Sequence, residues 1–221
     1  MIWSRIKIPI TINKESHPLE IVFFISITFL LYFVMACKPV RDTTDLFYYH
    51  TDSIQPGDII LRKSYGLISD IITSQLKDTV SISHCGILDK NEKGEFYVIH
   101  TLSKMVSDYD GMQSCSLEEF LNDSRPETVR VVRFRNKNSK KIADNARYYL
   151  KEKIPFDGDF NINDTTAFYC SELPIHIIRN IFGTDISFNA QKPKFSLFMN
   201  PDFFSIIPFM YKKSPDSIAD R

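Results

Sequence analysis

The chain has 221 residues, of which 43% are hydrophobic and 24% are charged. This length and composition are typical of one globular domain with a sizeable core. The 27 basic residues balance 27 acidic ones, so the chain lacks the excess of positive charge that is typical of proteins that bind nucleic acid.

Residues 1–37 are expected to be a signal or membrane segment. An uncharged, apolar run covers residues 21–37 and ends in the letters VMAC, where the small Ala36 precedes Cys37. This end resembles a bacterial lipobox, in which the cysteine accepts lipid; a plain membrane anchor is the alternative. Both interpretations place the protein in the bacterial cell envelope, membrane-anchored, with its domain outside the cytoplasm. Residues 38–51 are then a polar tether.

Residues 52–211 are expected to form one domain, followed by a polar tail at 212–221. Predicted strands alternate irregularly with predicted helices, without repeated βαβ units, so the fold class is α+β. The strands are expected within residues 55–63, 81–102 (two strands and a loop) and 128–135, and the helices within residues 65–77, 116–121, 139–153 and 170–183.

Local sequence signals mark the helix ends. Ser116 and Glu119 form a capping-box pattern, and Ser139 is expected to cap the next helix. Pro174 is tolerated only in the first turn of the last helix, and Gly183 is expected to end it. The last two signals fix the position of that helix along the chain.

Cys170, in the segment TTAFYCSELP, is a candidate nucleophile. Because Pro174 sets the start of the last helix close to it, the sulfur is expected near free backbone N–H groups, which favour the thiolate. A buried cysteine that only fills space is the alternative. The four cysteines, at positions 37, 85, 115 and 170, contain no CxxC pair, so neither a disulfide framework nor a zinc ribbon is indicated.

The two strands within residues 81–102 carry His84 and His100. If the hairpin folds about Glu92, the two histidines lie opposite each other on one face and share a hydrogen bond that orients the base. Cys85 then points to the other face, which makes it a poor rival nucleophile. Two structural histidines are the simpler alternative. A zinc site made by His84, His100 and Cys170 is a third one, although it lacks a close-spaced pair of ligands.

Five motifs in this order, QPGDIIL, ISHCGIL, FYVIHTL, IPFDGDFNIND and FYCSELP, resemble the permuted papain-like amidases. These are the YiiX/YaeF-type branch of the NlpC-like cysteine hydrolases, and they are similar also to lecithin retinol acyltransferase-like proteins. The resemblance covers residues 52–210. It implies a circularly permuted papain-like fold, an antiparallel sheet or partial barrel with a cysteine-bearing helix packed on it. It also implies that Cys170 is the nucleophile, His84 the general base and His100 the residue that orients the base.

Two departures and one match accompany this resemblance. His100 stands where the branch often has glutamate, and Phe156 stands where it often has tyrosine. Asp157 matches the family, which implies a role in shaping the loop or in binding substrate. Glu172, in the first turn after the nucleophile, is expected to be a structural carboxylate that suits the helix dipole.

These residues together predict a cysteine hydrolase that cleaves amide or ester bonds without a metal or organic cofactor. The envelope location leaves two substrate classes open: murein peptides, and N-acylated or lipid molecules. A catalytically silent envelope-binding module of the same fold is the alternative, and a His/Cys metal-binding protein is a weaker one.

Overall fold

A computed structural model describes residues 47–136, 138–161, 164–184, 186, 194–209 and 211–213. They belong to one compact unit, residues 45–221. The expected signal segment with Cys37 lies outside the described residues, as does most of the polar tail. In the described ranges, no helix is long and apolar enough to cross a membrane.

The described residues form two antiparallel sheets and four α-helices. The main sheet has six strands in the order β5-β4-β3-β2-β6-β7, and β1 pairs with β8 in a separate ribbon. The strands are β1 (Phe47–Tyr49), β2 (Ile59–Arg62), β3 (His84–Lys90), β4 (Phe96–Leu102), β5 (Gly111–Ser116), β6 (Arg130–Phe134), β7 (Phe204–Ile207) and β8 (Tyr211–Lys213). The helices are α2 (Leu67–Leu76), α3 (Leu117–Asn122), α4 (Lys140–Glu152) and α5 (Glu172–Phe182), with 3₁₀ helices η1 (Pro126–Thr128) and η2 (Phe195–Met199). A mixed architecture around an antiparallel sheet agrees with the predicted α+β class, and β1 lies inside the segment that was expected to be a tether.

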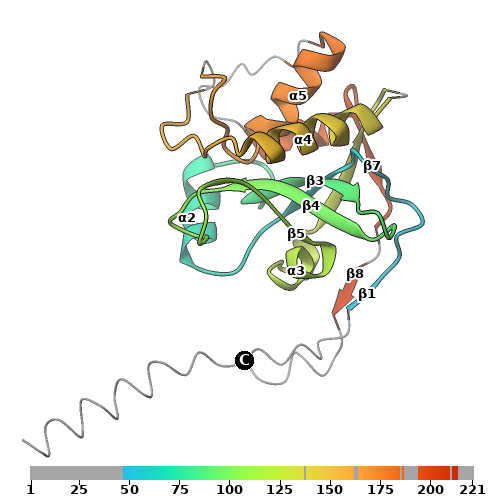
Figure 1. Cartoon of the computed structure of the whole chain (residues 1–221). Helices are drawn as coiled ribbons and strands as arrows, with labels where there is room; N and C mark the ends of the chain where they lie inside the picture. Colours follow the sequence, from blue (N-terminus) through green and yellow to red (C-terminus); the bar gives the residue numbers. More distant parts are fainter. Residues whose placement is uncertain are drawn as a thin grey trace, which may run out of the picture. The chain divides into compact units, whose positions relative to one another are not determined.

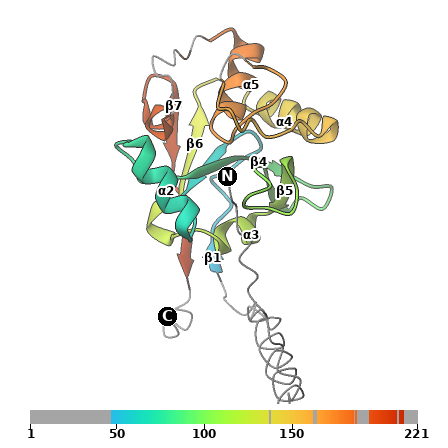
Figure 2. The same ribbon diagram turned by 90° about the vertical axis from the view of Figure 1, so that its left-hand side faces the viewer.

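The six-stranded sheet separates two apolar cores. Helices α4 and α5 cover one face, and α3 lies against the other (Figure 1); Figure 2 shows the same sheet from the side of α2. Alternate residues along each strand enter opposite cores, as the period of two requires. The α4/α5 core takes Ile59, Leu61, Cys85, Ile87 and Ile99, whereas the α3 core takes Ile60, Leu88 and Val98.

The hairpin of β3 and β4 forms in a register two residues away from the predicted one. Continued to the strand ends, this register sets His100 opposite Gly86 rather than opposite His84. The reason is the loop, which closes between the Asn91 N–H and the Glu95 carbonyl (3.0 Å) and is centred one residue later than expected. The predicted register is therefore wrong. A shift of two residues leaves every side chain on its predicted face, however, so both histidines still lie on one side.

Helix α2 forms where its spacing predicts, but its apolar residues are not its buried ones. Leu67 is 74% exposed, and Ile68 and Ile71 are also exposed, within the part of the chain that the structure describes. The buried residue of this helix is Ser69, whose hydroxyl bonds that of Ser83 (2.6 Å). The helical period was correctly predicted, whereas the packing face expected of an amphipathic helix was not.

The predicted helix ends are confirmed at two places and wrong at one. Ser116 and Glu119 form the expected capping box at α3, and Gly183 ends α5 with φ +60°. Ser139 precedes α4, but its side chain makes no capping hydrogen bond. Its hydroxyl is instead bonded by the Gln55 side chain (2.7 Å), which comes from the turn before β2. A tertiary contact has replaced the local one.

A bidentate ion pair ties the start of β2 to β6. Asp58, whose side chain is fully buried, accepts hydrogen bonds from Arg133 Nε (2.7 Å) and an Arg133 terminal nitrogen (2.8 Å). Removal of the Arg133 cation would leave the buried Asp58 carboxylate without a partner. Arg133→Met is therefore expected to lower the free energy of unfolding by about 3 kcal/mol. Urea unfolding measures this. The double variant with Asp58→Asn is the control and should recover part of the loss; equal stability of Arg133→Met and the parent protein would contradict the prediction.

Candidate active site

His84 and His100 form a buried, hydrogen-bonded pair. His84 is the first residue of β3 and His100 lies in β4, and each is 5% exposed. His84 Nε2 and His100 Nδ1 are 2.8 Å apart, and the ring centroids are 5.1 Å apart. Gly86 faces this pair: a Cβ there would lie 3.2 Å from the Cβ of His100. The predicted hydrogen bond between the histidines is thus present, although it joins diagonal rather than opposite positions.

Arg62 and Phe120 complete the cluster on this face of the sheet. The Phe120 ring, from α3, lies 5.9 Å from the ring of His84 and 6.0 Å from that of His100. Arg62 is paired with His84 across β2 and β3, and its guanidinium carbon lies 4.0 Å from the Phe120 centroid. Arg62 also bonds the Phe120 carbonyl and forms an ion pair with Asp123 (2.9 Å). Arg62 was not predicted as a site residue, because only the pairing of β2 with β3 sets it beside the histidines.

Both imidazoles are held in the neutral form. Burial, followed by His100 and the positive charge of Arg62, lowers the pKa of His84 well below its usual value. Burial and then Arg62 lower the pKa of His100 to about 3. A neutral imidazole can accept a proton near neutral pH, which is what a general base requires.

The neutral pair predicts that the fold loses stability in acid. Because each histidine binds its proton at lower pH when folded than when unfolded, stability is present above the unfolded pKa and falls as the pH drops from about 6.5 towards 3. In that window, each of the two histidines contributes up to ~1.4 kcal/mol per pH unit to the change of the unfolding free energy with pH. His100→Asn should therefore flatten the dependence of unfolding free energy on pH, measured by urea titration at several pH values. Replacement of the exposed His50 by asparagine is the control; equal slopes for the two variants would count against this account.

Cys170 lies two residues before α5, with Pro174 in the first turn of that helix, as predicted. The residue as a whole is half-buried. A hydrogen bond from the Cys85 thiol lowers the pKa of Cys170, as do backbone N–H groups of Cys85, Ser171 and Cys170 itself, while burial opposes the shift. The lowered pKa of Cys170 thus has two sources: Cys85 of β3, and the backbone of Cys170 and Ser171 just before α5.

The segment that carries Cys170 docks on β3 and β4. The Cys85 thiol donates to the Cys170 carbonyl (3.1 Å), and the Thr101 hydroxyl donates to the Phe168 carbonyl (3.1 Å). Pairing of β3 with β4 ends before Cys85, and the Cys85 backbone contributes to the lowered pKa of Cys170. The sulfur thus lies against the residue next to His84, although no hydrogen bond among the described residues joins it to either imidazole. Cys85 points away from the histidines, as predicted, but Cys170 lies on that same side. The imidazoles and the sulfur are therefore on opposite sides of the sheet and do not face each other as the predicted mechanism expects.

Two carboxyl groups near Cys170 are turned towards the protein itself. Asp157 is buried, and its two oxygens accept the N–H groups of Asp159 (2.9 Å) and Asn161 (2.6 Å), so it shapes its own loop. Glu172 is also buried, and burial, assisted by Asp157, raises its pKa to about 8. Glu172 was expected to be a carboxylate that suits the helix dipole; a carboxyl group with this pKa is mostly protonated at neutral pH, because burial outweighs the dipole.

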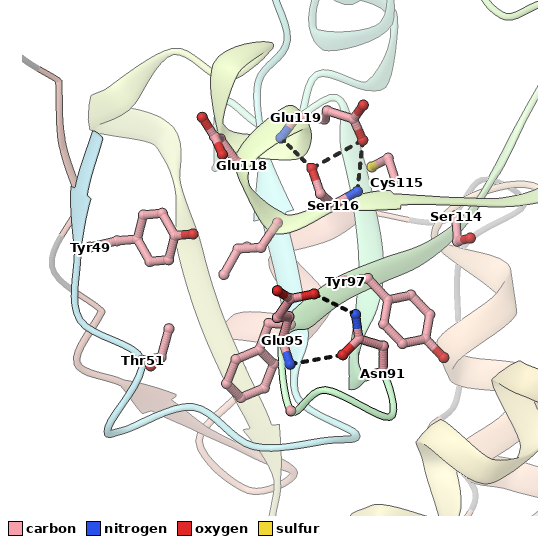
Figure 3. Close-up of a pocket in the computed structure, with 13 residues that line it drawn as sticks. Tyr49, Thr51, Asn91, Glu95, Tyr97, Ser114, Cys115, Ser116, Glu118 and Glu119 are labelled. Carbon is pink, nitrogen blue, oxygen red and sulfur yellow. Dashed lines mark hydrogen bonds between the residues drawn. The ribbon is translucent and has the colours of Figure 1, made fainter. Parts of the chain in front are cut away.

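A separate hollow of about 800 Å³ lies between β1, the β3–β4 loop and the start of α3 (Figure 3). Tyr49, Tyr97 and Glu118 are among its lining residues, which in the described chain include none of the three predicted catalytic ones. Two of its acidic side chains are engaged locally: Glu95 with Asn91, and Glu119 in the capping box of α3. The described residues also contain no group of three or more metal-ligating side chains.

Comparisons with solved structures give a partial likeness. No protein-family profile matches the sequence, and no curated protein matches it. A solved structure described as the metalloprotein yiiX from Escherichia coli O157:H7 is 24% identical to the chain, with a TM-score of 0.49. The match covers 61% of this chain and 69% of that one. The chemistry of the site must therefore be derived from its own residues.

Proposed function

We propose that the protein is a cysteine hydrolase that cleaves amide or ester bonds, with Cys170 as nucleophile, His84 as general base and His100 as the residue that orients the base. The observation that carries this proposal is the contact of Cys170 with β3. A thiol with a lowered pKa lies against the residue next to a neutral, hydrogen-bonded histidine pair. The imidazoles lie on the α3 side of the sheet and Cys170 packs on the α4/α5 side, so the proposal requires His84, the first residue of β3, to reach the sulfur around the end of that strand.

The histidine pair restricts which nitrogen can act. Because His84 Nε2 is engaged by His100, His84 Nδ1 is the nitrogen that remains for the thiol proton. It is free to accept only when His84 Nε2 carries the hydrogen and donates it to His100 Nδ1. In this tautomer His100 also accepts from the imidazolium that forms after proton transfer, which stabilises that charge. Arg62 opposes the same charge, so the ion pair of thiolate and imidazolium is not expected to persist at rest.

The reaction then proceeds by acyl transfer. The Cys170 sulfur attacks the carbonyl carbon, and the backbone N–H groups of Cys170 and Ser171, just before α5, stabilise the oxyanion. His84 returns its proton to the leaving amine or alcohol. Water, deprotonated by His84, then hydrolyses the thioester and restores the thiol.

The substrate and location are part of the proposal. We propose that the substrate is a murein peptide or an N-acylated or lipid molecule, and that the protein is held at the envelope membrane through its amino-terminal segment, with Cys37 as the lipid-bearing residue. The uncharged run at residues 21–37 supports this anchor. We further propose that Asp157 acts on substrate only indirectly, by holding its loop in place.

A thiol-labelling experiment distinguishes this enzyme from a silent binding module. With iodoacetamide at pH 7, Cys170 is expected to react faster than Cys85, which is fully buried, and faster than Cys115, whose pKa burial raises to about 11. Hydrolysis of murein fragments and of N-acyl amides is then measured for the same preparation. Slow labelling at all three cysteines, without hydrolysis of either substrate class, would favour the binding module.

A further inference from the structure

Cys85 and Cys170 are 85 positions apart in the sequence and in direct contact in the structure. The Cys85 sulfur lies 3.1 Å from the carbonyl oxygen of Cys170. The proximity of Cys85 is also the main cause that lowers the pKa of Cys170. Two thiols held together by strand β3 and by the segment before α5 form a potential redox pair.

The two thiols differ in access and in acidity. Cys170 is half-buried, whereas Cys85 is 0% exposed in the core beneath α4 and α5. Burial, followed by the contact with Cys170, raises the pKa of Cys85 well above its usual value, while the pKa of Cys170 is lowered. An oxidant from solvent therefore meets Cys170 first, and Cys85 is reached only through Cys170.

We propose that Cys85 is a resolving thiol that forms a reversible disulfide with Cys170 when a hydroperoxide oxidises the nucleophile. The proposal deepens the proposed function, because it requires Cys170 to be the reactive thiol of that site. Its geometric basis is the contact of the two residues; Cys115, on β5, is not part of it.

The chemistry balances in two steps. The Cys170 thiolate attacks one peroxide oxygen, the O–O bond breaks, and the released hydroxide takes a proton to become water, which leaves Cys170 as a sulfenic acid. The Cys85 sulfur then attacks the sulfenic sulfur, and its proton leaves with the hydroxide as a second water. Two thiols lose two electrons, and one molecule of hydrogen peroxide gains them. A thiol reductant reverses the bond, so the site is switched off without being destroyed.

In this proposal, Cys85 protects Cys170 from irreversible oxidation. A sulfenic acid with no neighbouring thiol is oxidised further to sulfinic and sulfonic acids, which thiol reductants do not restore. Valine or alanine at this buried position could fill the core but could not form a disulfide with Cys170. Cys85 is therefore expected to matter for recovery after oxidation more than for packing.

The test oxidises the full chain with hydrogen peroxide, alkylates the remaining thiols and identifies peptides by mass spectrometry. The parent protein should yield a peptide pair that links Cys85 to Cys170, and dithiothreitol should restore alkylation of both. Cys85→Ala should instead add two or three oxygens to Cys170, without recovery in dithiothreitol. Cys85→Val is the second variant if the alanine form does not fold, and Cys115→Ala, the matched control, should behave like the parent protein.

Two results would overturn the proposal. One is a linkage of Cys170 to Cys37 or Cys115 in place of Cys85; the other is full recovery of Cys170 in the oxidised Cys85→Ala variant. Both readouts are masses and do not require hydrolytic activity. If Cys85 and Cys170 become linked in a protein that hydrolyses neither substrate class, the redox pair stands and the hydrolase proposal is rejected. If the protein hydrolyses a substrate but the two cysteines do not become linked, the hydrolase stands and the redox pair is rejected.

Discussion

Cys170→Ala is expected to abolish hydrolysis, with a fall in rate of about 10⁴-fold or more. The alanine cannot form the thioester, so the covalent route is lost while the backbone donors at the start of α5 remain. Because Cys170 is half-buried and precedes the helix rather than lying inside it, the free energy of unfolding should change little. The measurement is the initial rate of hydrolysis of whichever substrate, murein fragment or N-acyl amide, the parent protein cleaves, together with a urea unfolding curve.

Cys115→Ala is the matched control for this experiment. It removes a partly buried thiol from β5, outside the contact between Cys85 and Cys170, and should retain the parent rate. Retention of activity in Cys170→Ala would reject the thiol mechanism. Loss of activity in both variants would point instead to a general effect on folding, which the unfolding curves would reveal.

His84→Ala is expected to lower the rate about 10²- to 10⁴-fold, the usual contribution of general acid–base catalysis. It should also slow alkylation of Cys170 near neutral pH, since the base that takes the thiol proton is gone. The burial and positive charge that lower the pKa of His84 place the acid limb of the parent pH–rate profile below the usual histidine range. The parent rate should therefore stay nearly constant from pH 7 down to about pH 6, the lower edge of that range.

His176→Ala controls for the loss of an imidazole in general. His176 lies within α5, where its ring packs against Phe168 (4.5 Å between centroids) and bonds Asn180 (2.7 Å). This variant should keep an unchanged pH–rate profile. If His84→Ala alkylates at the parent rate and keeps the parent profile, His84 is not the base. A parent acid limb centred near pH 6.5 would contradict the neutral, buried pair.

For the histidine pair, the sequence predicted the shared face of the sheet but not the register of the two strands. The alternation of side chains along a strand correctly predicted that His84 and His100 share a face. The register itself was wrong by two residues, because the loop at Asn91–Glu95 closes one residue later than assumed. Parity along a strand is a property of the backbone, whereas register depends on the loop that is finally selected.

At the helix ends, too, local contacts were predictable from the sequence and distant contacts were not. The capping box of Ser116 and the stop at Gly183 were predictable because both partners lie within one turn of the chain. Ser139 failed as a cap because Gln55, 84 positions away, took its hydroxyl. Glu172 was expected to be charged, since the helix dipole is visible in the sequence; the burial that neutralises it is not.

The sequence by itself determined the four helices, the strands β2, β3, β4 and β6, the faces of the β3–β4 hairpin and the placement of Cys170 before a helix, because these follow from backbone periodicity and from residues close together in the chain. It did not predict β1, β5, β7 or β8. Only the tertiary structure decided that Arg62 lies beside the histidines and that Cys85 contacts Cys170. Both contacts join segments that are far apart in the chain. Such contacts depend on which strands pair and how the helices cover the sheet, and no local pattern encodes that choice.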